Sequence, residues 1–588
     1  MTEPNVVYEF AHRRVDTARR EVLHMGKTIP MYPRCFDALL LLIEHRGTLL
    51  GKDFLMQALW PDVVVDENSL AKVISEVRRA LGEGPRDPGC IVTIPRRGYR
   101  FVADVVVQRN ADTAPAASGT TSPPPEIRAL AVLPFSFLNP AAEDETLSIG
   151  LADALITRLG QLRRTVVRPT SSITRFADQR MAPADAGRAL AVDAVIAGSV
   201  RRAGTTIRVS VQLVSVANDA VLWAEKFDSQ SGTALELEDS ISDRVATALT
   251  LTLARGERPP VARRQAADPD AYEHYIRGRY LISKRTRDAL VEAVARMERA
   301  IAIDPKFALA HAGLSEAWLH LGLRAAVSQS LRPREVMPKA RAAAENALAL
   351  DDSLSEAHAT LGQVLFNYEW KRDQGIAEFL RAIDLNPNNQ NAQHWYAMAL
   401  AGLGRFDEAL AQIQRALSVD PLAVIVNANA GFLMYRAGRL EEAVAKLRHT
   451  VAMEPGFLMT RYRLGLSLEA LGRYDEAIAE FQAMRPSEND PLGLAAIART
   501  LALMGRDDEA RHELHRVVEI ARNTYLPSVL IASIYIALND PDHALEYLER
   551  GVEERAIMLL WLPFDRYWDR LHGNPRFSRV LASIGLKG

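Results

Sequence analysis

The chain has 588 residues, of which 48% are hydrophobic and 24% are charged, and its formal net charge is −2. This length predicts several domains, and the composition is that of ordinary soluble proteins. The near-neutral total excludes a uniformly basic nucleic-acid-binding protein, so any such surface must be local. Two cysteines, Cys35 and Cys90, make no disulfide framework and fit a reducing cytosol.

The N-terminal stretch MTEPNVVYEFAHRR has neither a basic region nor an apolar one, so no signal peptide is expected. The most apolar candidate for a span, residues 421–435, is too short to cross a membrane and carries two Asn. We therefore expect no transmembrane helix and a cytoplasmic protein.

The first block, residues 1–107, begins with short strand-like pieces over residues 6–30. Three helices are predicted next, at 33–47, 51–60 and 66–82. The chain then runs into two strands, IVTIP and YRFVADV, joined by the turn RRG. Strands, three helices and a terminal hairpin predict a winged helix.

The third predicted helix has two different faces. Its apolar face would pack inward and consists of Leu70, Val73, Ile74, Val77 and Leu81. Its polar face consists of Lys72, Ser75, Glu76 and Arg79, with Arg78 at the flank. Asn68 or Asp66 can cap the start. Glu76 can pair with Lys72 or Arg79 within one helical turn, which is the simpler interpretation, or accept a hydrogen bond from cytosine N4.

The second block follows a segment of Ala, Ser, Thr and Pro at 108–126, which predicts a flexible linker. Residues 127–256 alternate strand-like and helix-like segments. The expected order is βαβαβββ with an exit helix at 234–255, which makes a small α/β or α+β domain.

The third block, residues 267–588, is periodic. Its landmarks recur every 33 or 34 residues: Gly404, Gly438, Gly472 and Gly505, then Pro387, Pro421 and Pro455, and also Ala409, Ala443 and Ala477. A pair of antiparallel helices needs a Gly turn, a Pro where the second helix stops, and small residues where the helices cross. The pattern resembles the tetratricopeptide repeat. We expect an α-solenoid of about eight repeats, an insertion near 323–334, and a C-terminal cap over LWLPFDRYWDRLHGNPRF.

The first block resembles the effector domain of OmpR/PhoB-type regulators, especially the CadC-like branch. The segments FDALLLLIEHRG, LWPDVVVDENSLAKVISEVRRALG and TIPRRGYRF carry the resemblance, which covers nearly all of residues 1–105. It implies that the third helix enters the major groove and that the wing lies along the minor-groove backbone. The DNA-binding residues implied are Asn68, Ser69, Lys72, Ser75, Glu76 and Arg79 on the helix and Arg96, Arg97 and Tyr99 on the wing. Gly98 would allow the tight turn, and Phe101 would return to the core.

The middle block resembles the TolB N-terminal-like or FlgO-like domain, through RALAVLPF, GLADALITRL and AVIAGSVRR. A role in sensing or dimerisation is a hypothesis. No phosphate loop and no HExxH motif occur, and His512 and His515 at i, i+3 lack an evident third ligand. We therefore expect no enzyme, no metal and no cofactor.

Together these features predict a mainly α, multidomain, one-component bacterial transcription regulator. The chain opens directly into the winged helix without a receiver domain, and it has the linker where CadC-like sensors have a membrane helix. The expected partners are double-stranded promoter DNA, bound by a homodimer, and a protein or peptide at the repeat groove, with the repeats receiving the signal. The alternative is a protein-interaction scaffold whose winged helix does not bind DNA.

Overall fold

The fold of the chain, given by a computed structural model, divides into two compact units, Met1–Ser122 and Pro123–Gly588. We call them the N-terminal unit and the C-terminal unit. The structure describes residues 6–11, 13–17, 21–24, 27–29, 31, 33–59, 67–83, 89–95, 97–109, 127–137, 144–163, 165–176, 181–203, 206–229, 241, 268–323, 331–484 and 490–586.

A five-stranded antiparallel sheet brings the two ends of the N-terminal unit together. Its order is β4-β3-β2-β1-β8, and its strands are β1 (Val6–Phe10), β2 (Arg13–Asp16), β3 (Glu21–His24), β4 (Lys27–Ile29) and β8 (Val106–Arg109). Because β8 pairs with β1, the sheet extends to Arg109, two residues past the limit expected at 107. The rest of the predicted linker, 110–126, lies outside the described residues.

Three helices and a second sheet complete this unit and confirm the winged helix. The helices are α1 (Pro33–Glu44), α2 (Lys52–Leu59) and α3 (Glu67–Ala80), and the sheet β5-β7-β6 consists of β5 (Leu49–Gly51), β6 (Ile91–Ile94) and β7 (Gly98–Phe101). The second hairpin strand ends at Phe101 rather than at 105, because the chain leaves the wing there to form β8.

The core of the N-terminal unit lies between α1, α3 and the two sheets. Leu70, Ile74, Val77 and Leu81 are buried on one side of α3, as the helical wheel predicted. Phe101 packs edge to face on Phe10 of β1, with ring centroids 5.1 Å apart. Burying an aliphatic or aromatic side chain of this size contributes about 1.5–3 kcal/mol, so this stripe fixes which face of α3 stays outside.

The C-terminal unit begins with the predicted α/β domain, and the order βαβαβββ is confirmed. The elements are β9 (Ala129–Val132), α4 (Asp144–Leu159), β11 (Val166–Val167), α6 (Pro183–Ala189), β12 (Ala194–Ala203), β13 (Thr206–Ser215) and β14 (Val221–Ser229), with the short β10 (Ser136–Phe137) and α5 (Thr170–Ile173) in addition. The sheet order is β11-β9-β12-β13-β14, and β10 pairs with β12. Apart from Ile241, the predicted exit helix lies outside the described residues.

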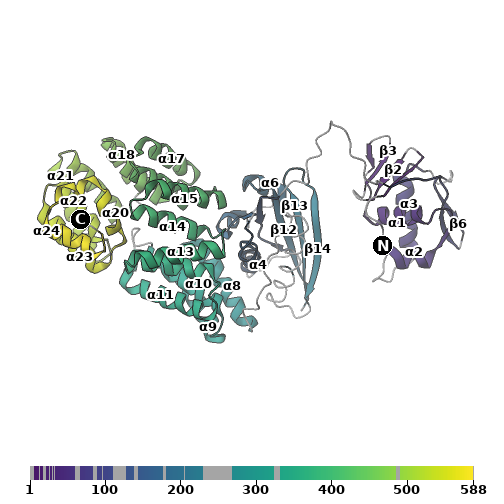
Figure 1. The fold of residues 1–588 in the computed structure, drawn as a ribbon, viewed down its shortest axis with the longest axis horizontal. Helices are drawn as coiled ribbons and strands as arrows, with labels where there is room; N and C mark the ends of the chain where they lie inside the picture. Colours follow the sequence, from purple (N-terminus) through teal and green to yellow (C-terminus); the bar gives the residue numbers. More distant parts are fainter. Residues whose placement is uncertain are drawn as a thin grey trace. The chain divides into compact units, whose positions relative to one another are not determined.

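Helix pairs form the rest of the unit (Figure 1). In the described residues they are α8 (Pro269–Lys284) with α9 (Arg287–Ile303), α10 (Ala308–Leu323) with α11 (Pro333–Leu350), α12 (Ser355–Gln363) with α13 (Arg372–Leu385), α14 (Gln390–Gly402) with α15 (Phe406–Val419), α16 (Val424–Arg436) with α17 (Leu440–Met453), α18 (Leu458–Ala470) with α19 (Tyr474–Ala483), α20 (Pro491–Leu503) with α21 (Asp507–Ala521), and α22 (Ser528–Ala537) with α23 (Pro541–Glu554). Most of the insertion expected near 323–334 lies outside the described residues.

The glycines that recur in the sequence occupy positions where the repeat geometry requires glycine. Gly404, Gly438, Gly472 and Gly505 all have φ between 74° and 76°, the left-handed conformation that lets the chain reverse between paired helices. Gly465 lies where α18 meets α19, and a Cβ there would come within 2.3 Å of the Phe481 ring. The close approach of the two helices therefore needs glycine at that position.

The inner surface made by the first helices of the pairs is partly covered by the chain itself. At one end the α/β domain packs α4 against α8 (Figure 1). Asn388, just before α14, donates through Nδ2 to the carbonyls of Gly160, Leu162 and Thr165, at 2.9–3.1 Å. Its Oδ1 accepts from the amide of Val167 in β11. One asparagine therefore joins the repeats to the edge of the α/β domain.

The C-terminal segment covers the other end of this surface, in addition to capping the last pair. It consists of the 3₁₀ turns η4 (Ile557–Phe564) and η5 (Arg566–Leu571) and the helix α24 (Pro575–Ser583). The rings of Trp561 and Phe432 lie 5.1 Å apart, and Asp565 forms a buried ion pair with Arg436 of α16. The segment predicted as an end cap thus also runs back along the middle repeats.

Candidate nucleic-acid interface

The outer face of α3 carries the polar side chains that the sequence predicted. Lys72, Ser75 and Arg79 are exposed, whereas Ser69 and Glu76 are partly exposed. The side chain of Asn68 is not among those described, and Asp66 lies outside the described residues. Since the opposite face of α3 is buried in the core, the orientation of the helix is fixed, and these exposed side chains lie together on its outer surface.

The carboxylate of Glu76 contacts two other side chains of the same unit. Its Oε1 lies 3.9 Å from Nη2 of Arg79, one turn along α3, and its Oε2 accepts from the Cys35 thiol of α1 at 3.4 Å. The predicted pairing with Arg79 is therefore present as a loose surface contact. Burial, the hydrogen bond to Glu76 and the nearby Glu76 charge raise the pKa of the Cys35 thiol to about 11, so this residue stays a neutral donor.

The tip of the wing is shaped by Gly98. Its φ is 143°, and a Cβ there would lie 1.9 Å from the carbonyl oxygen of Leu50 on β5. The amide of Arg97 donates to the carbonyl of Ile94 at 3.0 Å and closes the turn, which leaves the Arg97 side chain exposed. Arg96 lies outside the described residues.

Tyr99 differs from the expectation for a wing contact. Its side chain is only 8% exposed and belongs to the core of the N-terminal unit. Because side chains alternate along a strand, Tyr99 lies on the same face of β7 as the fully buried Phe101 and points inward. We therefore assign Tyr99 to packing and leave it out of the proposed contacts.

Arg78 is a positioning residue that sequence reasoning left at the flank of the helix. Its Nη2 donates to the carbonyl of Ile91 and to Oγ1 of Thr93 on β6, both at 2.8 Å. Arg13 of β2 donates to the carbonyl of Leu81, just after the same helix. The bonds of Arg78 fix α3 relative to the wing, and the bond of Arg13 fixes its end relative to the first sheet. The only sign of this role in the sequence was the position of Arg78 at the flank of the polar face.

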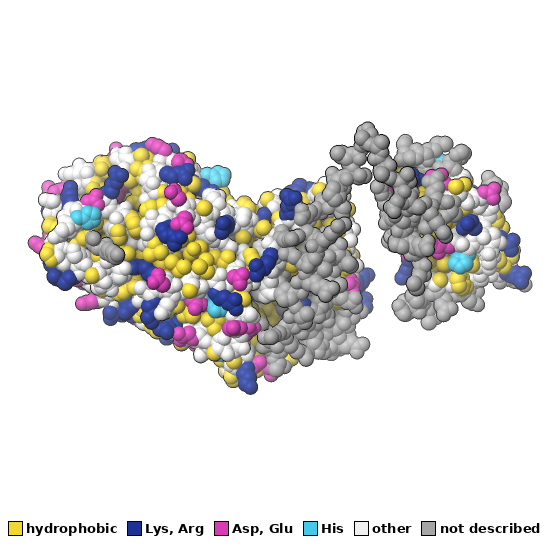
Figure 2. Space-filling model, in the orientation of Figure 1, with side chains coloured by type: hydrophobic (Ala, Val, Ile, Leu, Met, Phe, Trp, Pro, Cys, Tyr) yellow, Lys and Arg dark blue, Asp and Glu magenta, His cyan; other side chains and the backbone are white. Residues whose placement is uncertain are grey.

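The visible face of the helix pairs carries both signs of charge (Figure 2). Lys and Arg side chains are interspersed with Asp and Glu over the visible face of the helix pairs (Figure 2). Within the described part of the chain, no group of three His, Cys, Asp or Glu is arranged to hold a metal ion. The helices of that same part include none long and apolar enough to cross a membrane.

Known protein families match all three parts of the chain. Residues 26–101 match the family described as "Transcriptional regulatory protein, C terminal", and residues 126–244 match "HilA/YgeH-like transcriptional regulator, second domain". Tetratricopeptide repeat families match residues 378–411, 429–491 and 528–556. The chain joins an OmpR/PhoB-type winged helix to a HilA-like second domain and tetratricopeptide repeats. The middle domain, whose sequence resembles the TolB N-terminal-like or FlgO-like domain, is the part that matches the HilA-like family.

Individual relatives resemble parts of this winged-helix chain. Transcriptional regulator HilA of Salmonella typhimurium is 24% identical over 313 residues, which are 51% of each chain. Transcriptional activator CadC of Escherichia coli is 30% identical over 87 residues, or 15% of this chain and 17% of CadC. Putative adenylate cyclase 3 of Rhizobium meliloti is 31% identical over 196 residues, 33% of each. The chain thus spans at most about half of the length of these relatives.

Proposed function

We propose that the chain is a one-component, sequence-specific transcription regulator of the bacterial cytoplasm. In this proposal α3 enters the major groove of promoter DNA and the wing tip contacts the phosphate backbone. The observation that supports it best is that Lys72, Ser75 and Arg79 are exposed together on one face of α3. The opposite face of this helix is buried, and Arg78 at its flank is hydrogen-bonded to the wing. Lys and Arg donate to phosphates or to guanine, and Ser donates to base edges or phosphates.

Asn68, Ser69, Glu76 and Arg96 remain proposed contacts beside this surface. We further propose that two copies bind tandem half-sites, and that the C-terminal unit receives the signal or a protein partner. The domain limits proposed for these roles are 1–109 for DNA, since β8 extends past the expected limit of 107, 110–126 for the linker, 127–256 for the α/β domain and 267–588 for the repeats. Since the chain itself covers much of the inner repeat surface, a partner there would have to displace the C-terminal segment or use another face.

Binding of the full chain to duplex DNA across a salt series tests this function. Sites are first selected from a random duplex library, and the dissociation constant is then measured by fluorescence anisotropy. Arg97→Ala should weaken binding to all sequences alike and reduce the salt slope by about 0.9, because one phosphate contact is lost. Arg14→Ala removes an exposed arginine from β2 of the other sheet and should leave the slope unchanged.

A second variant separates specificity from backbone binding. Lys72→Ala on the outer face of α3 should change which bases are preferred at one position of the selected site, at a cost of about 1–3 kcal/mol. If the folded chain shows no salt-dependent binding to any duplex at low salt, the scaffold alternative takes over.

A further inference from the structure

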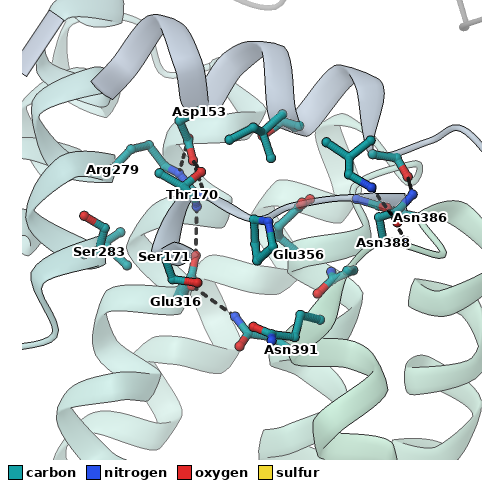
Figure 3. A pocket seen from close by; sticks show the side chains of 18 of the residues that line it. Asp153, Thr170, Ser171, Arg279, Ser283, Glu316, Glu356, Asn386, Asn388 and Asn391 are labelled. Carbon is teal, nitrogen blue, oxygen red and sulfur yellow. Dashed lines mark hydrogen bonds and ion pairs between the residues drawn. The ribbon is translucent and has the colours of Figure 1, made fainter. Parts of the chain in front are cut away.

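A polar cavity lies where the α/β domain meets the first four helix pairs. Its volume is about 120 Å³. One wall comes from α4 and α5, and the other walls come from α8, α10, α12 and the start of α14 (Figure 3). Its charged lining residues are Asp153, Arg279, Arg285, Glu316 and Glu356. Because two domains of one unit form it, the cavity is a place where a bound molecule would contact both.

On one side of the cavity the charges already satisfy one another. Arg279 bridges two carboxylates, with Nε 2.9 Å from Oδ2 of Asp153 and Nη1 2.8 Å from Oε2 of Glu316. Asp153 also accepts from the Thr170 hydroxyl, and Glu316 accepts from Nδ2 of Asn391 at 3.4 Å. Figure 3 shows this network beside Glu356. Because these charged groups pair with one another, this side of the cavity offers no unpaired charge to a ligand.

Two polar groups in the cavity lack side-chain partners. Among the described residues, the carboxylate of Glu356, in the first turn of α12, forms no ion pair or hydrogen bond with another side chain, and it accepts a hydrogen bond from its own backbone amide. The side chain of Gln390, at the start of α14, is only 9% exposed, and its Nε2 has no hydrogen-bond partner. A buried, unpaired amide donor costs free energy, so its retention in the cavity lining points to an absent acceptor.

The net charge of the residues that line the cavity indicates what kind of ligand would fit there. Three carboxylates (Asp153, Glu316 and Glu356) face two guanidinium groups (Arg279 and Arg285), which leaves one negative charge in excess. Burial is the main cause that raises the pKa of Glu356, and the nearby Glu316 and Asp153 carboxylates add to it, while Arg279 and the hydrogen bond from the backbone oppose it. A cation beside Glu356 would remove this penalty.

We propose that the cavity binds a small organic ammonium ion that also carries a hydrogen-bond acceptor. The ammonium group pairs with the Glu356 carboxylate, and the acceptor receives the hydrogen bond of Gln390 Nε2. An inorganic cation would satisfy Glu356 alone and would leave the Gln390 donor unpaired. The site is independent of DNA binding, so it can be tested whether or not the winged helix binds DNA.

Ethanolamine and 4-amino-1-butanol are suitable probes, measured by ligand-observed NMR titration on the full chain. Ethylene glycol is the matched neutral control, because it replaces only the ammonium group of ethanolamine by a hydroxyl. A ligand with four heavy atoms binds with a dissociation constant no tighter than about 50 µM, so the titration extends into the millimolar range. We expect at least one of the two amino alcohols to bind at least tenfold more tightly than the glycol.

Variants test the assigned residues. Glu356→Gln keeps the shape of the side chain and should weaken amino-alcohol binding at least tenfold, and Gln390→Leu should weaken it several-fold. Glu298→Gln removes the same charge from the exposed side of α9 and should have no effect. The proposal is overturned if neither amino alcohol binds, if the glycol binds equally well, or if a folded Glu356→Gln chain binds as the natural chain does.

Discussion

Gly98 shows how one residue determines the shape of the wing. Its φ of 143° and the Leu50 carbonyl 1.9 Å from a would-be Cβ both exclude any side chain. We expect Gly98→Ala to lower the free energy of unfolding of the N-terminal unit by about 2–4 kcal/mol. Gly82→Ala, where φ is 70° and nothing lies within 4 Å, should cost only about 1 kcal/mol in the same urea titration. Equal losses would show that conformation alone, and not the contact with β5, requires glycine at 98.

The two buried thiols make a separate prediction at the residue scale. Burial and a neighbouring carboxylate, Glu76 for Cys35 and Glu83 for Cys90, raise both thiol pKa values to about 11. An unfolded cysteine has a pKa near 8.5, so the stability that the neutral thiols contribute is present below about pH 8.5 and is lost as the pH rises toward about 11. Urea unfolding of the N-terminal unit at pH 8 and pH 10 should show this loss, and a chain with Cys35→Ala and Cys90→Ala should lose less.

At the scale of helices, buried and exposed ion pairs of the repeats differ in what they contribute. Glu469 of α18 accepts from Nη2 of Arg499 at 3.0 Å and from the Thr500 hydroxyl at 2.7 Å, and all three side chains are buried. Glu469→Gln should cost about 3 kcal/mol in thermal unfolding, because it leaves a buried guanidinium without its counter-charge. Glu442→Gln breaks an exposed pair with Arg439 in a repeat turn and should cost at most about 1 kcal/mol. A similar shift in Tm for both would contradict this difference.

Local patterns predicted the elements well, and contacts between distant elements account for what was missed. The apolar stripe from Leu70 to Leu81 and the glycines spaced by 33 or 34 residues are periodic, so each pattern predicts its own helix or turn. The bonds from Arg78 to β6 join residues 13 and 15 apart, and no period marks them. Tyr99 was a wing contact implied by the family resemblance, whereas in the structure it is buried in the core beside Phe101. The cavity of Glu356 and Gln390 depends on how two domains pack, which one sequence does not encode locally.

At the scale of the whole molecule, Arg168 joins the α/β domain to the repeats. It is buried and donates to the carbonyls of Leu190 and Ala191 in its own domain and of Ser418 and Val419 at the end of α15. Arg168→Met removes two of the hydrogen bonds between the domains and leaves those of Asn388 and the Asp153–Arg279 ion pair. If Arg168 is the main link, the variant should split one calorimetric transition of the C-terminal unit into two. Arg163→Met removes an exposed contact with Asp384 and should keep a single transition. A single transition in the Arg168 variant would mean that the domains are coupled by other contacts.

The C-terminal segment changes how the repeats respond to mechanical load. A free-ended solenoid lengthens like a spring and gives way one repeat at a time, because each repeat contacts only its neighbours. Here Nη1 of Arg372 holds the carbonyl of Gly585 at 2.7 Å, across 213 residues of sequence. Arg555 holds the carbonyl of Tyr368 in the same way. A chain stretched from its two ends would have to break these ties first, so its force trace should show one abrupt release instead of a staircase.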